Sequence, residues 1–316
     1  MIISASRRTD IPALYSEWFM NRLREGEMLV PNPYNRKKLQ RIKLSPDTID
    51  MIVFWTKNPE PMIPHLKELD QMGYHYSFQV TITDYGEDIE PEAPCTEDVM
   101  ASFILMSEML GKERMDWRFD PILLDGRYTV DYHLHQFDTM CRWLQDATTR
   151  CTISFIDAYR ESPYRELEIE EMEELAEGIS KISEKYHLPV YTCAEKADLS
   201  RFGIMSGACI DKERIQRILG YRLDVKKAAG QRKACGCVES LDIGVYDTCI
   251  HGCRYCYATG TGSAENAVKK YEQHDPKSPL LIGHLKGDEV ITDKILTSNR
   301  DDQLSLFDLP RIDLIY

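Results

Sequence analysis

Short hydrophobic segments alternate with helical patterns over roughly the first 220 residues of the chain. The hydrophobic segments are rich in Val, Ile, Phe, Tyr and Thr and show little polar alternation, as expected for strands with both faces buried. Strands that alternate with helices favour a parallel sheet with right-handed crossovers. The predicted strands cover residues 2–6, 51–56, 76–83, 116–122, 151–157 and 189–193.

The segments between these strands carry helix-start signals. Asp10 precedes Pro12, Thr96 precedes two acidic residues, and Thr129 precedes Asp131. A run of glutamates over residues 166–177 is interpreted as the wet face of an amphipathic helix. Six such strand–helix units predict an α/β fold, a partial or complete parallel (β/α) barrel.

Each predicted strand is followed, at its C-terminal end, by ionisable side chains. Because these ends converge on one face of a barrel, a polar site is expected there. Cations suit anionic groups of a ligand, and carboxylates can move protons or bind hydroxyls. The candidate binding residues are Arg7, Arg8, Lys57 and Arg118, and the candidate catalytic residues are Asp120, Asp157 and Glu195.

The composition changes past Gly220, and we predict a domain over residues 1–225 and a cysteine-rich lobe with a tail over 226–316. Within the lobe, a Cys-Gly-Cys segment and a short strand pattern at 241–246 lead into a cysteine loop. A helical stretch at 263–273 follows. The loop residues Cys249, Cys253 and Cys256 have the spacing C-x₃-C-x₂-C.

Three thiolates within eight residues can wrap one compact object, and thiolates suit iron–sulfur centres. The candidate ligand is a 4Fe–4S cluster with one iron left open. Gly252 is expected to permit the tight turn, and His251 to set the course of the loop without binding metal.

With Tyr255 before its last cysteine, this loop resembles that of the radical S-adenosylmethionine (SAM) enzymes, C-x₃-C-x-aromatic-C. The resemblance implies that the open iron chelates SAM and that a reductant such as flavodoxin or ferredoxin supplies the electron for radical chemistry. It also implies that Arg7, Arg8, Lys57 and Arg118 hold SAM and an anionic, small-molecule or nucleotide-like substrate.

From Ser-Arg-Arg-Thr-Asp at residues 6–10 to the cysteine loop, the chain resembles a bacterial family known as domain of unknown function 1848. In radical SAM enzymes the loop ordinarily follows the first strand, whereas here it follows six units. This difference favours a circularly permuted barrel, or a lobe that folds back over the barrel mouth.

Other interpretations of the cysteines remain open. Cys235 and Cys237 can face one side of an extended segment, so they could ligate the fourth iron, act as redox thiols or help bind a second metal. With Cys253 and Cys256 they could instead form a zinc site, which would suit a non-catalytic binding or adaptor protein. The remaining cysteines, at 95, 141, 151, 193 and 209, are expected to be small buried hydrophobes, with Cys193 near a strand end.

The formal net charge of −13 argues against generic binding to nucleic acid backbones. No signal-peptide pattern and no apolar run of membrane-spanning length is present, so a cytoplasmic protein without membrane contact is predicted. A basic run over residues 36–43 is interpreted as a solvated face, with contact to an anionic substrate as the alternative.

The C-terminal tail contains one further pattern. It resembles the linear peptide by which bacterial replication and repair proteins dock on the sliding clamp. The alternative is an apolar segment that seals the barrel. The residues concerned are Gln303, Leu304, Ser305, Leu306 and Phe307.

Overall fold

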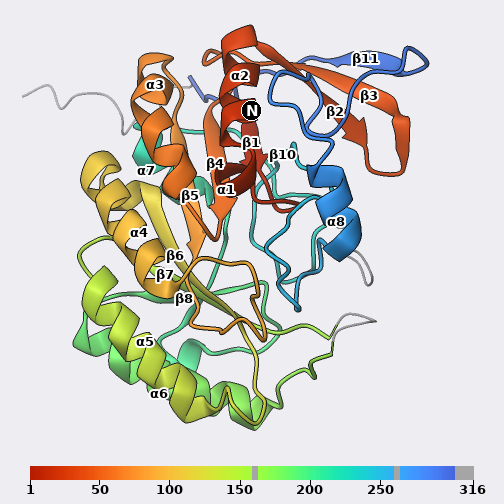
Figure 1. Cartoon of the computed structure of the whole chain (residues 1–316). Helices are drawn as coiled ribbons and strands as arrows, with labels where there is room; N and C mark the ends of the chain where they lie inside the picture. The colour runs from red at the N-terminus through yellow and green to blue at the C-terminus, as the bar shows by residue number, and fades with distance from the viewer. Residues whose placement is uncertain (159–162, 260–263, 303–316) are drawn as a thin grey trace, which may run out of the picture.

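The computed structural model describes residues 1–158, 163–259 and 264–302. Its central element is an eight-stranded sheet in the order β10-β1-β4-β5-β6-β7-β8-β9, in which every pairing is parallel (Figure 1). The α/β fold and the six predicted strands are therefore confirmed. The strands are β1 (Ile2–Ala5), β4 (Met51–Thr56), β5 (Tyr76–Thr81), β6 (Met115–Ile122), β7 (Cys151–Phe155), β8 (Val190–Cys193), β9 (Met205–Gly207) and β10 (Leu241–Asp242).

The helices connect these strands, and Figure 1 shows α3, α4, α5 and α6 along one side of the sheet. Asp10 and Thr129 cap α1 and α5 by accepting backbone N–H groups, as predicted. Thr96 is instead the first residue of α4, and Cys95 holds the cap position. The helices are α1 (Ile11–Leu14), α2 (Ser16–Glu25), α3 (Leu66–Gln71), α4 (Thr96–Leu110), α5 (Val130–Leu144), α6 (Ile169–Lys185), α7 (Lys212–Leu219) and α8 (Ala264–Tyr271), with 3₁₀ turns at Glu60–His65, Lys112–Arg114 and Ser200–Phe202.

The two faces of the sheet differ in chemistry although both are buried. In β5, Phe78 and Val80 belong to the main hydrophobic core, whereas Ser77 and Gln79 between them are buried on the opposite face. Arg118 in β6 is buried in the same way. Contrary to the sequence interpretation, β5 does alternate, and the polar positions line an interior instead of facing water.

Strands distant in the sheet order share one apolar cluster, which shows that the sheet curves strongly. Ile2 of β1 and Val53 of β4 belong to the same cluster as Cys193 of β8 and Ile210, which follows β9. The sheet has two edges, β10 and β9. A segment over residues 235–240 lies beside the β9 edge, where the Val238 amide donates to the Ile210 carbonyl at 3.1 Å, and then continues into β10.

A second sheet, which the sequence patterns did not predict, has the order β11-β3-β2, with bounds Glu27–Asn32 for β2, Asn35–Lys43 for β3 and Val290–Lys294 for β11. It accounts for the basic run at 36–43. Lys37 pairs with Asp288 and Arg41 with Asp293, while Lys43 pairs with Glu27. These exposed pairs agree with the interpretation of a solvated face.

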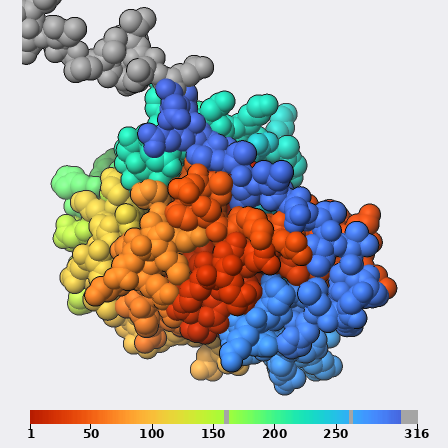
Figure 2. Space-filling model, turned by 90° about the horizontal axis from the view of Figure 1, so that it is seen from above, coloured from red at the N-terminus to blue at the C-terminus, as the bar shows by residue number. Residues whose placement is uncertain are grey.

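The C-terminal part of the chain lies against the N-terminal part, as the adjacent blue and red surfaces in Figure 2 show. The Met1 ammonium donates to the Thr297 carbonyl at 2.8 Å, and β11 pairs in parallel with β3. Residues of the predicted C-terminal lobe thus contribute strands to both sheets. Among the described residues, we find no helix with the length and apolar character to cross a membrane.

Candidate functional site

A cavity of about 490 Å³ opens at the C-terminal ends of the strands of the main sheet. Most of the predicted site residues line it, as do Thr9, Trp55 and His251. Residues more than 240 positions apart in the sequence therefore meet at one place. The predicted residues in the lining are Arg7, Lys57, Arg118, Asp120, Asp157, Cys235, Cys237, Cys249, Cys253 and Cys256.

Two predicted residues lie outside this lining. The Arg8 guanidinium lies 5.2 Å from the ring centroid of Tyr246 and 3.8 Å from the Asp242 carboxylate, and Arg8 does not line this cavity. Glu195 accepts a hydrogen bond from the Phe155 amide at 2.9 Å, and burial raises its pKa to about 7. The inclusion of Arg8 among the cavity residues is corrected accordingly, and Glu195 supports the end of β7.

Arg118 and Asp120 form a buried ion pair inside β6. The Arg118 Nε donates to Asp120 at 3.0 Å, and Ser154 donates to the same carboxylate at 3.1 Å. With these partners, Asp120 holds Arg118 in place and is poorly suited to act as a base. The guanidinium carbons of Arg118 and Arg7 lie 5.3 and 5.9 Å from the ring centroid of Trp55, so both cations contact the same indole.

Lys57 is the centre of a second buried group. Its ammonium donates to Glu90 at 2.7 Å, and the hydroxyls of Thr83 and Tyr255 donate to the same carboxylate. Burial opposes the charge on Lys57, but the adjacent Glu90 raises the pKa of Lys57 above its ordinary value. The aromatic residue of the cysteine motif thus fastens the loop to the ends of β4 and β5. No sequence signal identified Glu90.

His251 fastens the loop at another point. Its Nε2 lies 3.0 Å from Asp10, which also accepts the Lys57 amide at 2.8 Å. Although burial opposes protonation, the hydrogen bond to Asp10 raises the pKa of His251. Gly252 has φ = 70°, and a Cβ there would meet Pro91 at 3.0 Å. The positioning role of His251 and the turn at Gly252 agree with the predictions.

Asp242 in β10 connects the approach to the loop with β1. Its carboxylate accepts from the hydroxyls of Ser4 and Ser6 at 3.0 and 2.7 Å and from the Arg7 amide at 2.9 Å. The nearest side-chain approach of Arg7 to Asp242 is 3.9 Å. Of the three predicted cations in the lining, Arg7 is therefore the least tightly held by a carboxylate.

The three loop cysteines are half-buried and line the cavity together. Burial raises the pKa of Cys253 to about 12 and that of Cys249 well above its ordinary value. Among the residues that the structure describes, no three His, Cys, Asp or Glu side chains are grouped so as to hold a single metal ion. A four-iron cluster has a different requirement, because each thiolate binds its own iron.

Cys235 and Cys237 line the same cavity, as do Cys193 and Cys209. Interaction with the neighbouring Cys237 thiol lowers the pKa of Cys235 to about 6. Cys193 and Cys209 are buried members of an apolar cluster, as expected, and in addition their Sγ atoms lie 2.8 Å apart. Cys141 and Cys151 are core residues as expected, whereas Cys95 is exposed.

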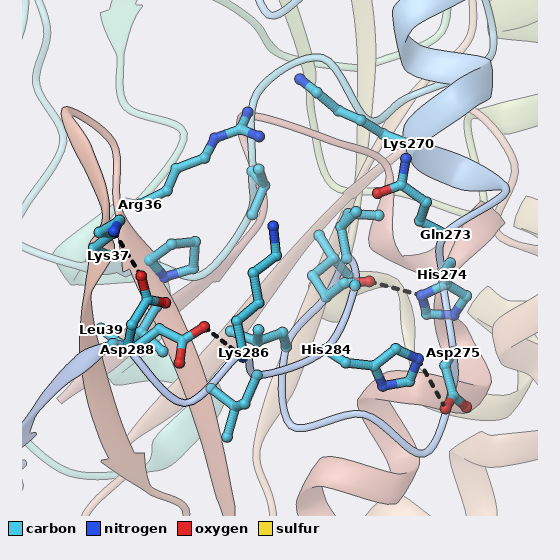
Figure 3. A pocket seen from close by; sticks show the side chains of 18 of the residues that line it. Arg36, Lys37, Leu39, Lys270, Gln273, His274, Asp275, His284, Lys286 and Asp288 are labelled. Carbon is cyan, nitrogen blue, oxygen red and sulfur yellow. Dashed lines mark hydrogen bonds and ion pairs between the residues drawn. The ribbon is translucent and has the colours of Figure 1, made fainter.

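A larger cavity of about 820 Å³ lies between β3, α8 and the chain over residues 272–289 (Figure 3). Its lining carries charges of both signs, and several pair with one another, as Lys37 does with Asp288 and His284 with Asp275. None of the candidate site residues lines it. The sliding-clamp pattern at Gln303 to Phe307 lies outside the described residues.

The fold and the cavity define an α/β protein with a cysteine-rich site at the C-terminal ends of a parallel sheet. The chain belongs to the family described as Domain of unknown function (DUF1848), which matches residues 2–258. The match includes all six predicted strands and the whole cysteine loop. The family resemblance that the sequence suggested is thus confirmed.

The remaining comparisons are weak. No match was found among curated proteins. A protein described as an alpha-L-fucosidase from Bacteroides thetaiotaomicron VPI-5482 is 9% identical with a TM-score of 0.26, over 71% of this chain and 83% of that one. The carboxyl transferase domain of Rhizobium etli pyruvate carboxylase is 9% identical with a TM-score of 0.28, over 66% of this chain and 39% of that one. Similarity at this level supports no inference.

Proposed function

We propose that the protein is a radical-SAM-type iron–sulfur enzyme that acts on a small anionic substrate. The observation that carries the proposal is the shared cavity, in which the three loop cysteines face the polar ends of the parallel strands. The strongly curved sheet then serves as a partial (β/α) barrel, and the chain after residue 226 brings the cluster loop to its mouth.

The chemistry of the donor set fits the cluster. Cys249, Cys253 and Cys256 offer three soft sulfur ligands on one short loop, which leaves one iron of a cubane without a protein ligand. When bound, such a cluster would supply the electron that cleaves SAM to methionine and a 5′-deoxyadenosyl radical. A flavodoxin or ferredoxin is the expected class of electron donor.

The residues of this chain have binding and positioning roles. Arg7 is the cation best placed for a carboxylate of SAM or of the substrate, because Lys57 and Arg118 are already neutralised. The Thr9 hydroxyl and the Trp55 indole N–H are buried and find no hydrogen-bond partner among the described residues. Both residues line the cavity, so both polar groups are available to a ligand.

Asp157 at the end of β7 is paired with Arg232, which comes from the segment before the Cys-Gly-Cys turn. This pair joins the sheet to that segment at the rim of the cavity. Asp157 and Arg232 are therefore placed to contact the part of the substrate nearest to solvent.

Anaerobic purification tests the proposal. We expect about four irons and four sulfides per chain from the loop cluster, a brown colour, and loss of both in C249A/C253A/C256A. The matched control is C95S, which removes an exposed cysteine far from the motif and should leave the iron content unchanged. Reduced protein incubated with SAM should release 5′-deoxyadenosine. A colourless wild-type protein after iron and sulfide reconstitution, or no 5′-deoxyadenosine from the brown protein, would sink the proposal.

A further inference from the structure

Two cysteines from neighbouring strands meet in the wall of the candidate cavity. Cys193 is the last residue of β8, and Cys209 follows closely after the end of β9. Both line the cavity, and they are 9% and 6% exposed. Their Sγ atoms lie 2.8 Å apart. A disulfide bond is about 2.0 Å long, so the two sulfurs need to approach by only about 0.8 Å to be joined.

The backbone around this contact is held in place. β8 and β9 are parallel neighbours, and a Cβ at Gly207 would lie 2.8 Å from a side-chain atom of β8, so glycine lets the two strands approach closely. The carbonyl groups of Ala208 and Ile210, on either side of Cys209, each accept a hydrogen bond, at 3.2 and 3.1 Å. A bond between the two sulfurs therefore requires movement of side chains and not of strands.

The two sulfurs differ in their surroundings. The buried Arg118 guanidinium donates to the Cys209 Sγ at 2.8 Å, and a neighbouring cation stabilises a thiolate, which is the reactive form of cysteine. The hydrogen bond from Cys193 and the charge of Arg118 lower the pKa of Cys209, whereas the Cys237 thiol and burial raise it, with a net rise. Contact with Cys209 raises the pKa of Cys193 well above its ordinary value. Negative charge therefore forms more readily on Cys209, while Cys193 keeps its proton.

We propose that Cys193 and Cys209 are a redox-active pair that forms a reversible disulfide by exchange with low-molecular-weight disulfides that enter the cavity. The Cys209 thiolate attacks one sulfur of the small disulfide, so a mixed disulfide forms and one small thiolate leaves. Cys193 then attacks the Cys209 sulfur, the internal disulfide forms, and the second small thiolate leaves. The departing thiolates take up the two protons that the cysteines release. The pair is oxidised by two electrons, and the small disulfide is reduced to two thiols.

The exchange changes one wall of the candidate site. In the dithiol form, Arg118 contacts both the Asp120 carboxylate and the Cys209 sulfur. A disulfide carries no negative charge and its sulfurs are weak hydrogen-bond acceptors, so oxidation weakens the second contact. The redox state of the pair thus alters the polar lining of the cavity without participation of the three loop cysteines.

Peptide mapping of the full-length chain tests the proposal, with bis(2-hydroxyethyl) disulfide as the probe. Trypsin cleaves after Lys and Arg, so Cys193 falls in the peptide over residues 186–196 and Cys209 in the peptide over 202–212, and neither peptide contains a second cysteine. Reduced, folded protein treated with the probe should yield these two peptides as a linked pair, and dithiothreitol should separate them. The variants C235S/C237S and C249A/C253A/C256A should give the same linked pair.

Single substitutions identify the attacking sulfur. C193S should stop at the first step and carry one 2-hydroxyethylthio group on Cys209, whereas C209S should keep Cys193 unmodified over the same time, with the far-UV circular dichroism of both variants retained. Protein unfolded in urea should link its cysteines without preference for this pair. Three results would overturn the proposal: no linked pair from the folded protein, the same yield of that pair in urea, or modification of Cys193 in C209S as fast as that of Cys209 in C193S.

Discussion

Substitution of Glu90 by alanine gives the sharpest test of how the cysteine loop is fastened. Glu90 is 7% exposed and accepts hydrogen bonds from Lys57, Thr83 and Tyr255. Its removal leaves the Lys57 ammonium, whose side chain is 12% exposed, without a counter-charge. Because an unpaired buried charge is strongly unfavourable, the free energy of unfolding should fall by about 3 to 5 kcal/mol.

A double substitution distinguishes the ion pair from simple loss of packing. K57M/E90M removes both charges and keeps apolar side chains in the space, so its effect should be well below that of E90A. Y255F removes one hydrogen bond to a charged acceptor and should reduce the free energy of unfolding by about 1.5 to 3 kcal/mol. The exposed Glu184→Ala substitution in α6 is the matched control, expected within about 0.5 kcal/mol of wild type.

Urea unfolding followed by circular dichroism measures these differences, with all variants at the same metal content. A free energy of unfolding for E90A within about 1 kcal/mol of that for E184A would refute the reasoning, since removal of one partner from a buried ion pair is expected to destabilise the protein by more than that. A double variant as unstable as E90A would show that the charge on Lys57 is not the cause.

Two further predictions concern the cavity and the core. If Arg7 binds SAM in the proposed enzyme, Arg7→Ala should weaken SAM affinity about tenfold or more, because it removes a hydrogen bond between charged groups. Arg8→Ala should change SAM affinity less than about twofold. Equilibrium dialysis of the reconstituted protein measures both, and equal losses would contradict the placement of Arg8 outside the cavity. Burial lowers the pKa of His133 below its ordinary value of 6.5, and its Nε2 donates to the Leu123 carbonyl at 2.7 Å. As the pH falls, the unfolded chain takes up a proton on this histidine at a higher pH than the folded protein does. The free energy of unfolding should therefore decline below about pH 6.5, and less steeply in His133→Gln. An identical pH profile in that variant would exclude His133 as the cause.

The strand segments, most helix starts and the cysteine loop could be predicted from the order of amino acids alone. Each of these rests on neighbours in the chain: a run of β-branched and aromatic residues, a cap such as Asp10 before a helix, or three cysteines within eight residues. The convergence of strand ends also followed, because parallel strands place their C-terminal ends on one side. That rule brought Arg7, Lys57 and Arg118 to one predicted site.

Which polar groups pair at that site, and which cysteines meet, became known only from the folded chain. Glu90 lies in a loop with no local signal, yet it receives three hydrogen bonds there. The sequence predicts Cys193 and Cys209 only as buried hydrophobic residues, because single cysteines form no spacing pattern. Their position beside Cys237 in one apolar cluster depends on the curvature of the sheet and on the return of the chain after β9. Contacts between residues far apart in sequence arise from packing of whole elements, which short-range periodicity does not encode.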